Sequence, residues 1–155
     1  VFDEVVPPTE NAKMRARFQF RSALYVQVGK PTRDGTLESV QADASGAHFT
    51  IRNAGTANVR FNGQYALWKA ESYPGVAATE IVPGIGTTKP TLATGQLILD
   101  ALPANPVLPG DTRSLAIGFG AAKLKPGRYV LDLNGKLGDA ALDRAVEFTV
   151  ADTPR

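Results

Sequence analysis

Few side chains in this sequence could carry acid–base or metal chemistry. The chain contains one histidine, His48, and no cysteine, which excludes thiolate nucleophiles, disulfides, cysteine-ligated metal sites and most histidine-rich ones. His48 alternates with Phe49 and Ile51, so a strand here would place it with Thr50 and Arg52 on the wetter face. We expect a solvated or side-chain-paired imidazole at this position rather than a catalytic base.

Two pairs of carboxylates suggest a different chemistry. Asp3 with Glu4, or Asp100 with Asp132, could form the acid–base pair of a glycoside hydrolase, but nothing in their spacing brings either pair together. The isolated GxG segments lack the helix that follows a nucleotide-binding glycine loop, and no GxSxG, P-loop or HExxH motif is present. The sequence therefore predicts a protein that is not an enzyme, with no catalytic residue, metal ligand or cofactor.

Basic residues form the more informative group. Between Lys13 and Arg33 there are six Lys or Arg residues and no acid, and four of them would share one face of a strand. Three interpretations stay open: protection of an edge strand against uncontrolled pairing, capture of an anion or carboxylate, and nucleic-acid binding. The last is disfavoured, and no nucleic-acid partner is expected, because Phe18 and Phe20 lie on the opposite face and do not interleave with the charges.

The composition places these residues in a folded chain. Its 155 residues are 43% hydrophobic and 21% charged, with a net charge of +2, which is typical of one or at most two globular domains. No apolar run reaches the roughly 18–20 residues of a membrane-spanning helix, so no membrane insertion is expected. The first residues, VFDEVV, carry no secretory signal, and we expect the chain to be part of a longer protein.

The clearest periodicity runs from Lys13 to Val28, where one parity is mostly apolar and the other mostly basic or polar. Such a strand would span roughly 50 Å at about 3.3 Å per residue, far beyond the usual length. A strand this long usually passes from one sheet or domain to another. Residues 29–35 then read as a stop and a linker.

Beyond the linker, shorter strands are predicted between turn signals. The absence of any amphipathic helix predicts an all-β fold, an antiparallel β-sandwich. Residues 73–94, rich in Gly, Pro, Thr and Ala, are expected to form a long surface excursion. The expected strands are 37–42, 47–53, 57–68, 96–101, 112–119, 128–133 and 142–150, and the turn signals are Asn53-Ala54-Gly55, Asn62-Gly63, Pro109-Gly110-Asp111, Pro126-Gly127 and Asn134-Gly135.

The apolar face of the long strand admits two interpretations. Met14, Ala16 and Phe18 in alternation would ordinarily form half of a sandwich core, and this interpretation stays open above all for residues 20–28. If the strand is an edge, its amino-terminal half can instead be lent to another protein's incomplete sheet. Main-chain hydrogen bonds would then give affinity, and side-chain pockets would give specificity.

In these features the sequence resembles the periplasmic chaperones of the chaperone–usher pathway, which assemble bacterial pili from subunits. These have two immunoglobulin-like domains, and an FxEIPP-type segment precedes the long last strand of the first domain. Residues 2–8 (FDEVVPP) are similar to that segment, with one extra residue, and residues 15–28 (RARFQFRSALYVQV) are similar to the long strand. Residues 51–59 (IRNAGTANV), 107–110 (VLPG) and 125–129 (KPGRY) resemble landmarks of the second domain.

The resemblance implies a division of the chain and a function. Residues 1–30 would be the end of a first immunoglobulin-like domain, and residues 31–155 a second immunoglobulin-like β-sandwich. The partners would be a pilin-like subunit, complemented by the donor residues Met14, Ala16, Phe18 and Phe20, and an outer-membrane usher. The localisation would be periplasmic, and an exposed donor strand also makes a strand-exchanged homodimer an expectation.

Two departures from the family pattern concern the end of the long strand. The subunit-anchoring lysine of the family falls at Ala23, and Arg21, on the same face, is our hypothesis for a substitute carboxylate anchor. The family's closing proline falls at Val28, with Pro31 three residues late. The competing prediction is a non-catalytic extracytoplasmic immunoglobulin-like module that links or displays other domains, with residues 13–28 paired within their own chain.

Overall fold

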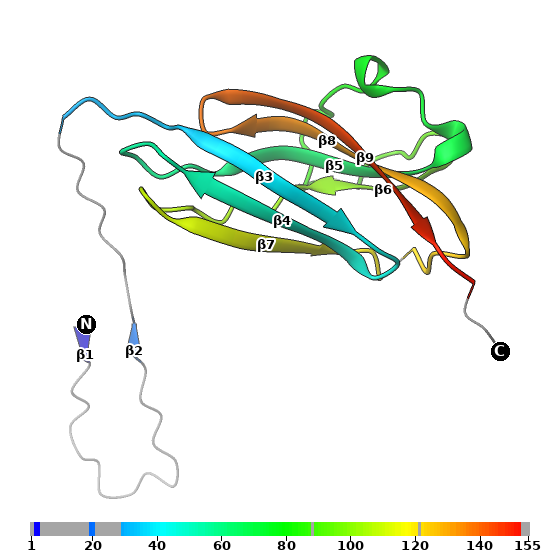
Figure 1. The fold of residues 1–155 in the computed structure, drawn as a ribbon, viewed down its shortest axis with the longest axis horizontal. Coiled ribbons are helices and arrows are strands. Elements are labelled where there is room, and N and C mark those ends of the chain that lie inside the picture. Colours follow the sequence, from blue (N-terminus) through cyan, green and yellow to red (C-terminus); the bar gives the residue numbers. More distant parts are fainter. Residues whose placement is uncertain (1, 4–18, 21–28, 88, 121, 153–155) are drawn as a thin grey trace, which may run out of the picture.

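The computed structural model describes residues 2–3, 19–20, 29–87, 89–120 and 122–152. Two antiparallel sheets lie face to face (Figure 1), one with the order β3-β4-β7 and the other with the order β6-β5-β8-β9. A separate two-stranded sheet pairs β1 (Phe2–Asp3) with β2 (Gln19–Phe20). The sandwich strands are β3 (Gly35–Ala42), β4 (Gly46–Asn53), β5 (Phe61–Lys69), β6 (Gln96–Ala101), β7 (Thr112–Gly118), β8 (Gly127–Leu137) and β9 (Ala140–Val150), with short 3-10 helices η1 (Ala70–Ser72) and η2 (Val76–Ala78) after β5.

The strand order defines the class of fold. A three-stranded sheet packed on a four-stranded sheet, with antiparallel neighbours throughout, is the arrangement of an immunoglobulin-like β-sandwich. β6 pairs with β5, so it extends the four-stranded sheet rather than the three-stranded one. The prediction of an all-β, immunoglobulin-like sandwich is confirmed.

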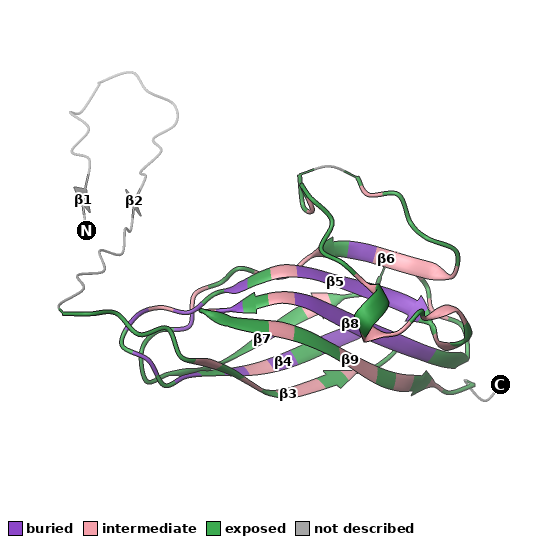
Figure 2. Cartoon of the chain, turned by 90° about the horizontal axis from the view of Figure 1, so that it is seen from above, coloured by how far each residue is buried: buried purple, intermediate pink, exposed green. Residues whose placement is uncertain are grey.

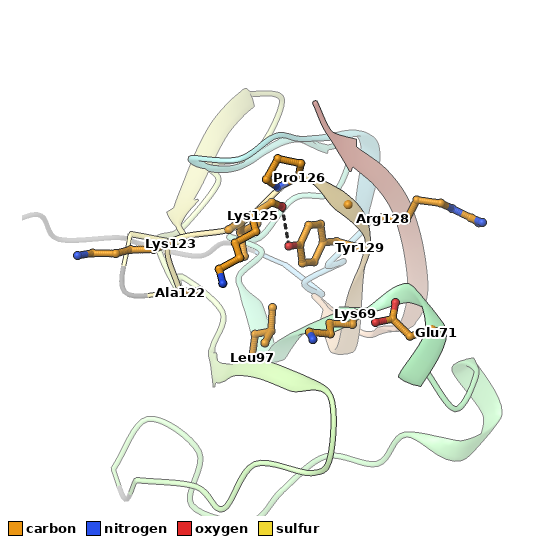
Figure 3. Close-up of a pocket in the computed structure, with 11 residues that line it drawn as sticks. Lys69, Glu71, Leu97, Ala122, Lys123, Lys125, Pro126, Arg128 and Tyr129 are labelled. Atoms are coloured by element: carbon orange, nitrogen blue, oxygen red, sulfur yellow. Dashed lines mark hydrogen bonds between the residues drawn. The ribbon is translucent and has the colours of Figure 1, made fainter. Parts of the chain in front are cut away.

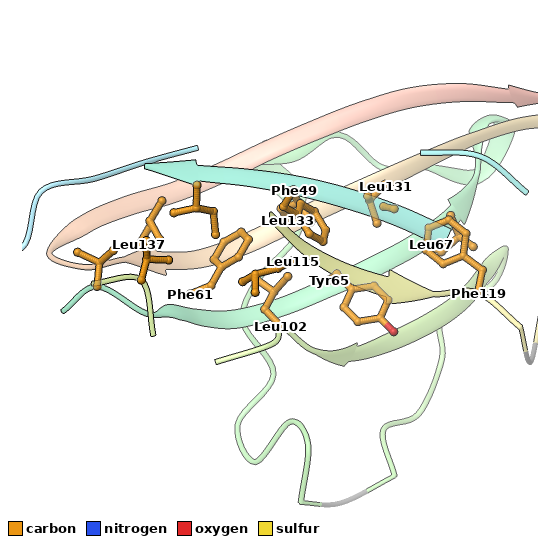
Figure 4. Close-up of a cluster of buried hydrophobic side chains, with 14 of the residues drawn as sticks. Phe49, Phe61, Tyr65, Leu67, Leu102, Leu115, Phe119, Leu131, Leu133 and Leu137 are labelled. Carbon is orange, nitrogen blue, oxygen red and sulfur yellow. The ribbon is translucent and has the colours of Figure 1, made fainter. Parts of the chain in front are cut away.

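Alternation of side chains builds the core between the sheets. On β4, Ala47, Phe49 and Ile51 are fully buried, whereas His48 and Arg52 are exposed on the other face. Phe49 and Phe61 meet edge to face, with ring centroids 5.7 Å apart. Figure 4 shows the side chains that fill the space between the sheets, among them Phe49, Phe61, Tyr65, Leu67, Leu102, Leu115, Phe119, Leu131, Leu133 and Leu137.

β8 does not alternate in this way. Residues 129–134 are all buried (Figure 2), because the strand is covered on both faces. One face meets the core, and the other lies under the chain that follows β5. There Trp68, Leu99 and Val130 form a second apolar cluster, against which Tyr73 and Ile85 pack. The predicted surface excursion therefore covers one side of the four-stranded sheet with its first half.

Two predicted turns are wrong. Asn62-Gly63 lies inside β5, Asn134-Gly135 lies inside β8, and the two glycines are direct cross-strand partners. A Cβ on either glycine would collide with the backbone of the facing strand, so the glycines permit a close approach of two strands rather than a reversal. The chain turns instead at 138–139, where Gly138 has a φ of 63°.

Strand positions agree with the sequence prediction within a few residues, with two exceptions. The strand expected from residue 57 begins at Phe61, after Val59 has made an isolated bridge to Val107. β8 continues to residue 137 rather than ending at 133, and β9 begins at residue 140 rather than at 142, so the two strands form one long hairpin. In the described part of the chain no helix has the length and apolar character needed to cross a membrane.

Candidate functional site

The predicted donor strand falls mainly outside the described residues. Met14, Ala16, Phe18 and the proposed anchor Arg21 lie there. Phe20 belongs to β2, where its Cα partner is Phe2 in an antiparallel register, and Gln19 is opposite Asp3. The FxExxPP-like segment and the long alternating segment are therefore hydrogen-bonded neighbours at these positions.

The Asp100–Asp132 pair considered for glycoside hydrolysis does not form. Asp100 is opposite Tyr65 in the sheet, and Asp132 is opposite Ala66, the next residue of β5. Because neighbouring residues of a strand point to opposite faces, the two carboxylates project from opposite faces of the sheet. Among the described residues there is also no group of three or more His, Asp or Glu side chains placed to hold a metal ion.

The turn after β4 anchors the segment that enters the sandwich. Asn53 is fully buried; its Nδ2 donates to the carbonyl oxygens of Ala57 at 2.8 Å and Val107 at 3.0 Å, and its Oδ1 accepts from the Gly55 amide at 2.9 Å. The Thr32 carbonyl oxygen accepts from the amides at the far side of this turn, at 2.9 and 3.0 Å. The turn that contributed to the family resemblance thus fixes where the linker docks.

A buried polar cluster lies on the outer face of the four-stranded sheet, under the chain that follows β5. Asp132 on β8 is fully buried and accepts a hydrogen bond at its Oδ1 from the Tyr73 hydroxyl, at 3.0 Å. Asn134 donates from Nδ2 to Thr79 Oγ1 at 3.3 Å and to Asp143 Oδ1 at 3.0 Å. Asp132 Oδ2 and Asn134 Oδ1 are buried without a hydrogen-bond partner in the described part of the chain.

The surroundings of Asp132 shift the pKa of its carboxyl upward, with burial as the largest cause. Removal from water raises the pKa of the Asp132 carboxyl, and the nearby charge of Asp143 adds to this, while the Thr79 and Tyr73 hydroxyls act in the opposite direction. Burial, and then the charge of Asp132, raise the pKa of Tyr73, which stays protonated as the donor. The hydrogen bonds of Asp132 with Tyr73 and of Asn134 with Thr79 anchor the covering chain to β8.

A basic hollow lies at the end of the sandwich where β8 begins (Figure 3). Its volume is about 380 Å³, and it lies between the end of β5 and the segment 122–127. The Lys69 and Lys125 side chains are directed toward the space between Tyr129 and Leu97, whereas Lys123 extends outward. The Tyr129 hydroxyl donates to the Lys125 carbonyl oxygen at 2.7 Å, which ties this segment to the buried ring.

Neither the polar cluster nor the basic hollow was predicted from the sequence. Asp132 and Asn134 do carry a signal, since two polar residues alternate with apolar ones inside an otherwise apolar strand. The hollow carries none, because Lys69, Leu97 and Lys125 come from three separate segments. His48 is exposed on the same face of β4 as Arg52, as predicted.

Comparisons with known proteins leave the family open. No protein-family model matches the chain, and no curated protein does. The fold class is therefore given by the strand order alone.

Proposed function

We propose that this chain acts as a periplasmic chaperone of the chaperone–usher type, binding pilin-like subunits by donor-strand complementation for assembly at an outer-membrane usher. The observation that carries the proposal is the antiparallel pairing of Phe2 with Phe20, ahead of an immunoglobulin-like sandwich. It is the order in which the resembled family places its FxEIPP-type segment, its long last strand and its second domain.

The mechanism follows from the alternation along the long strand. A pilin-like subunit that lacks its final strand exposes an apolar groove between two sheet edges, which would aggregate in water. A donated strand would complete the backbone ladder and fill the groove with Met14, Ala16, Phe18 and Phe20. Burying one phenylalanine contributes about 1.5–3 kcal/mol before ordering costs, so Phe18 is a principal anchor. Arg21 would pair with a client carboxylate.

The test is co-purification with a pilin-like subunit that lacks its own final strand. We expect the wild-type chain to hold the subunit in a soluble complex and Phe18→Glu to lose it, because a carboxylate cannot be buried cheaply in an apolar pocket. Gln19→Glu adds the same charge on the opposite face and should keep the complex. Retention of the subunit by Phe18→Glu at the wild-type level would contradict the proposal.

The second candidate is a non-catalytic immunoglobulin-like interaction module. It is favoured by the core of the sandwich, which within the described part of the chain is built entirely from residues between β3 and β9. In that case residues 13–28 would be paired within their own protein. Amide hydrogen exchange on the full chain separates the two functions: slow exchange along both edges of this segment, with no subunit bound, favours the module.

A further inference from the structure

The basic hollow beside Tyr129 has no role in strand donation. We propose that it binds a carboxylate, presented by a short peptide segment of a partner protein next to an apolar side chain. The site belongs to the sandwich alone. It lies at the start of β8, whereas the linker bridges to the sandwich at the other end, through Asp34 and Gly138. At about 3.3 Å per residue, β8 separates the two by roughly 30 Å.

The charge of the hollow is largely uncompensated. Lys69, Lys123 and Lys125 make no ion pair within the described residues, and Glu71 is the single acid among the lining residues. Arg128, also at the rim, is neutralised by Glu147, at 2.9 Å. Lys69 and Lys125 are therefore directed toward one small space, with Lys123 as a further positive charge at its rim, and this arrangement favours an anion of low charge.

The apolar walls of the hollow favour a ligand that carries an apolar group next to its anion. Leu97, Leu124, Pro126 and the edge of Tyr129 line the hollow between the lysines. A volume of about 380 Å³ lies at the lower end of the usual range for ligand pockets, enough for one or two side chains. A carboxylate next to a leucine-like or phenylalanine-like side chain would satisfy both the ammonium groups and the apolar wall.

The segment that carries two of the lysines is held in place before any ligand arrives. The Tyr129 hydroxyl holds the Lys125 carbonyl, and the Tyr129 ring stacks on Phe148 with centroids 5.7 Å apart. Lys123 has a φ of 43°, a left-handed backbone conformation that is unfavourable for a non-glycine residue. Backbone strain of this kind is concentrated at binding and switch regions.

A carboxylate fits this site better than a phosphate chain. Nucleic acids are bound through many cationic contacts and by stacking on exposed aromatic faces. The net charge of the chain is only +2, and Tyr129 is buried with one face of its ring stacked on Phe148. Three of the four cations at the hollow are lysines, and the fourth, Arg128, is already paired with Glu147.

The experiment is an NMR titration of the full-length chain with three probes. They are an acetylated pentapeptide with two glutamates next to a leucine, the same peptide with glutamines, and inorganic phosphate. We expect the amide signals of residues 123–129 to shift with the glutamate peptide and not with the glutamine peptide. Stronger binding of phosphate at the same signals, or equal binding of both peptides, would overturn the carboxylate assignment.

Charge-matched variants locate the site. Lys69→Gln and Lys125→Gln should each lower the affinity for the glutamate peptide by about tenfold, because each variant loses one charge-assisted contact. Lys136→Gln removes the same charge from an exposed position near the other end of β8 and should leave affinity unchanged. If all three variants lowered the affinity for the glutamate peptide equally, the binding would depend on the overall charge of the protein, and the proposed site would be wrong. Phe18→Glu should bind the peptide normally, so failure of the proposed chaperone function is distinguishable from failure of this site.

Discussion

At the scale of single residues, two buried polar side chains do different work. Asn53 satisfies its side-chain amide group and its side-chain carbonyl oxygen through Gly55 and Ala57 of its own turn and through the distant Val107, so it stabilises the position of the linker and leaves no buried polar atom unpaired. Asp132 is only half satisfied, with one oxygen bonded to Tyr73 and the other unpartnered. A buried carboxylate in that state is costly unless it takes up a proton.

This asymmetry predicts a pH-dependent stability. The pKa of Asp132 is raised in the folded state, so protonation of this carboxyl stabilises the native protein relative to the unfolded chain. This contribution to the free energy of unfolding is complete below the ordinary pKa of 3.8 and is lost as the pH rises through the raised pKa. Asp132→Asn keeps an acceptor for Tyr73 and cannot ionise; we therefore expect it to be more stable than wild type at neutral pH, by about 1–3 kcal/mol, and nearly equal near pH 4.

Urea unfolding of wild type and Asp132→Asn between pH 4 and 8 measures this difference. Asp100→Asn, an exposed carboxylate on the opposite face of the same sheet, serves as the control and should follow the wild-type curve. A difference between wild type and Asp132→Asn that does not grow with pH would show that the native carboxyl is not the titrating group.

At the scale of elements, the chain after β5 is held to the sheet by the Gln64 side chain, which makes two hydrogen bonds to its backbone. Gln64 donates from Nε2 to the Glu80 carbonyl oxygen at 2.8 Å and accepts at Oε1 from the Val82 amide at 2.7 Å. These are the two bonds that a backbone neighbour would make. The excursion thereby covers the outer face of the sheet without adding a strand.

Gln64→Ala should therefore open the excursion locally. We expect the Val82 amide to lose most of its protection from hydrogen exchange, while amides of β8 stay protected and the global free energy of unfolding falls by only about 1–2 kcal/mol. Gln96→Ala is the matched control, since the Gln96 side chain bonds only to the nearby Ala93 amide. Unchanged protection at Val82 would mean that apolar contacts of Tyr73 and Ile85, and not Gln64, hold the excursion.

At the scale of the whole molecule, the sandwich carries its own stability. Every member of the main core cluster among the described residues lies between Leu37 and Val150, and the described part of the linker bonds to the sandwich from residue 32 onward. A chain of residues 30–155 should consequently fold alone, since it contains all of this described core. Its thermal midpoint should lie within a few degrees of the full chain, about 1 kcal/mol or less of stability.

Calorimetry of residues 30–155 and of the full chain checks this prediction. One cooperative transition in the short chain, at nearly the same temperature, is the expected result. A short chain that unfolds non-cooperatively would show instead that residues 1–29 contribute to the core of the sandwich. The division of the chain at residue 30 would then be wrong.

Local patterns determined most of the strands and the fold class. Alternating apolar residues on β4, or the run Gln96–Ala101, specify a strand and its buried face without reference to anything distant, because side chains alternate regardless of the partner. The same local pattern could not separate a turn glycine from a pairing glycine. Gly63 and Gly135 are distinguished only by facing each other across two strands that are more than seventy residues apart in the sequence.

Tertiary structure alone decided the sites. The sequence already indicates that Asp132 and Asn134 share a strand face, but only the fold brings Tyr73, Thr79 and Asp143 to them and buries the Asp132 carboxyl, which raises its pKa. The basic hollow likewise exists because the end of β5, the beginning of β6 and the segment before β8 lie side by side. Charge and burial at a point depend on everything within a few ångströms, and that neighbourhood is assembled from segments that no local pattern connects.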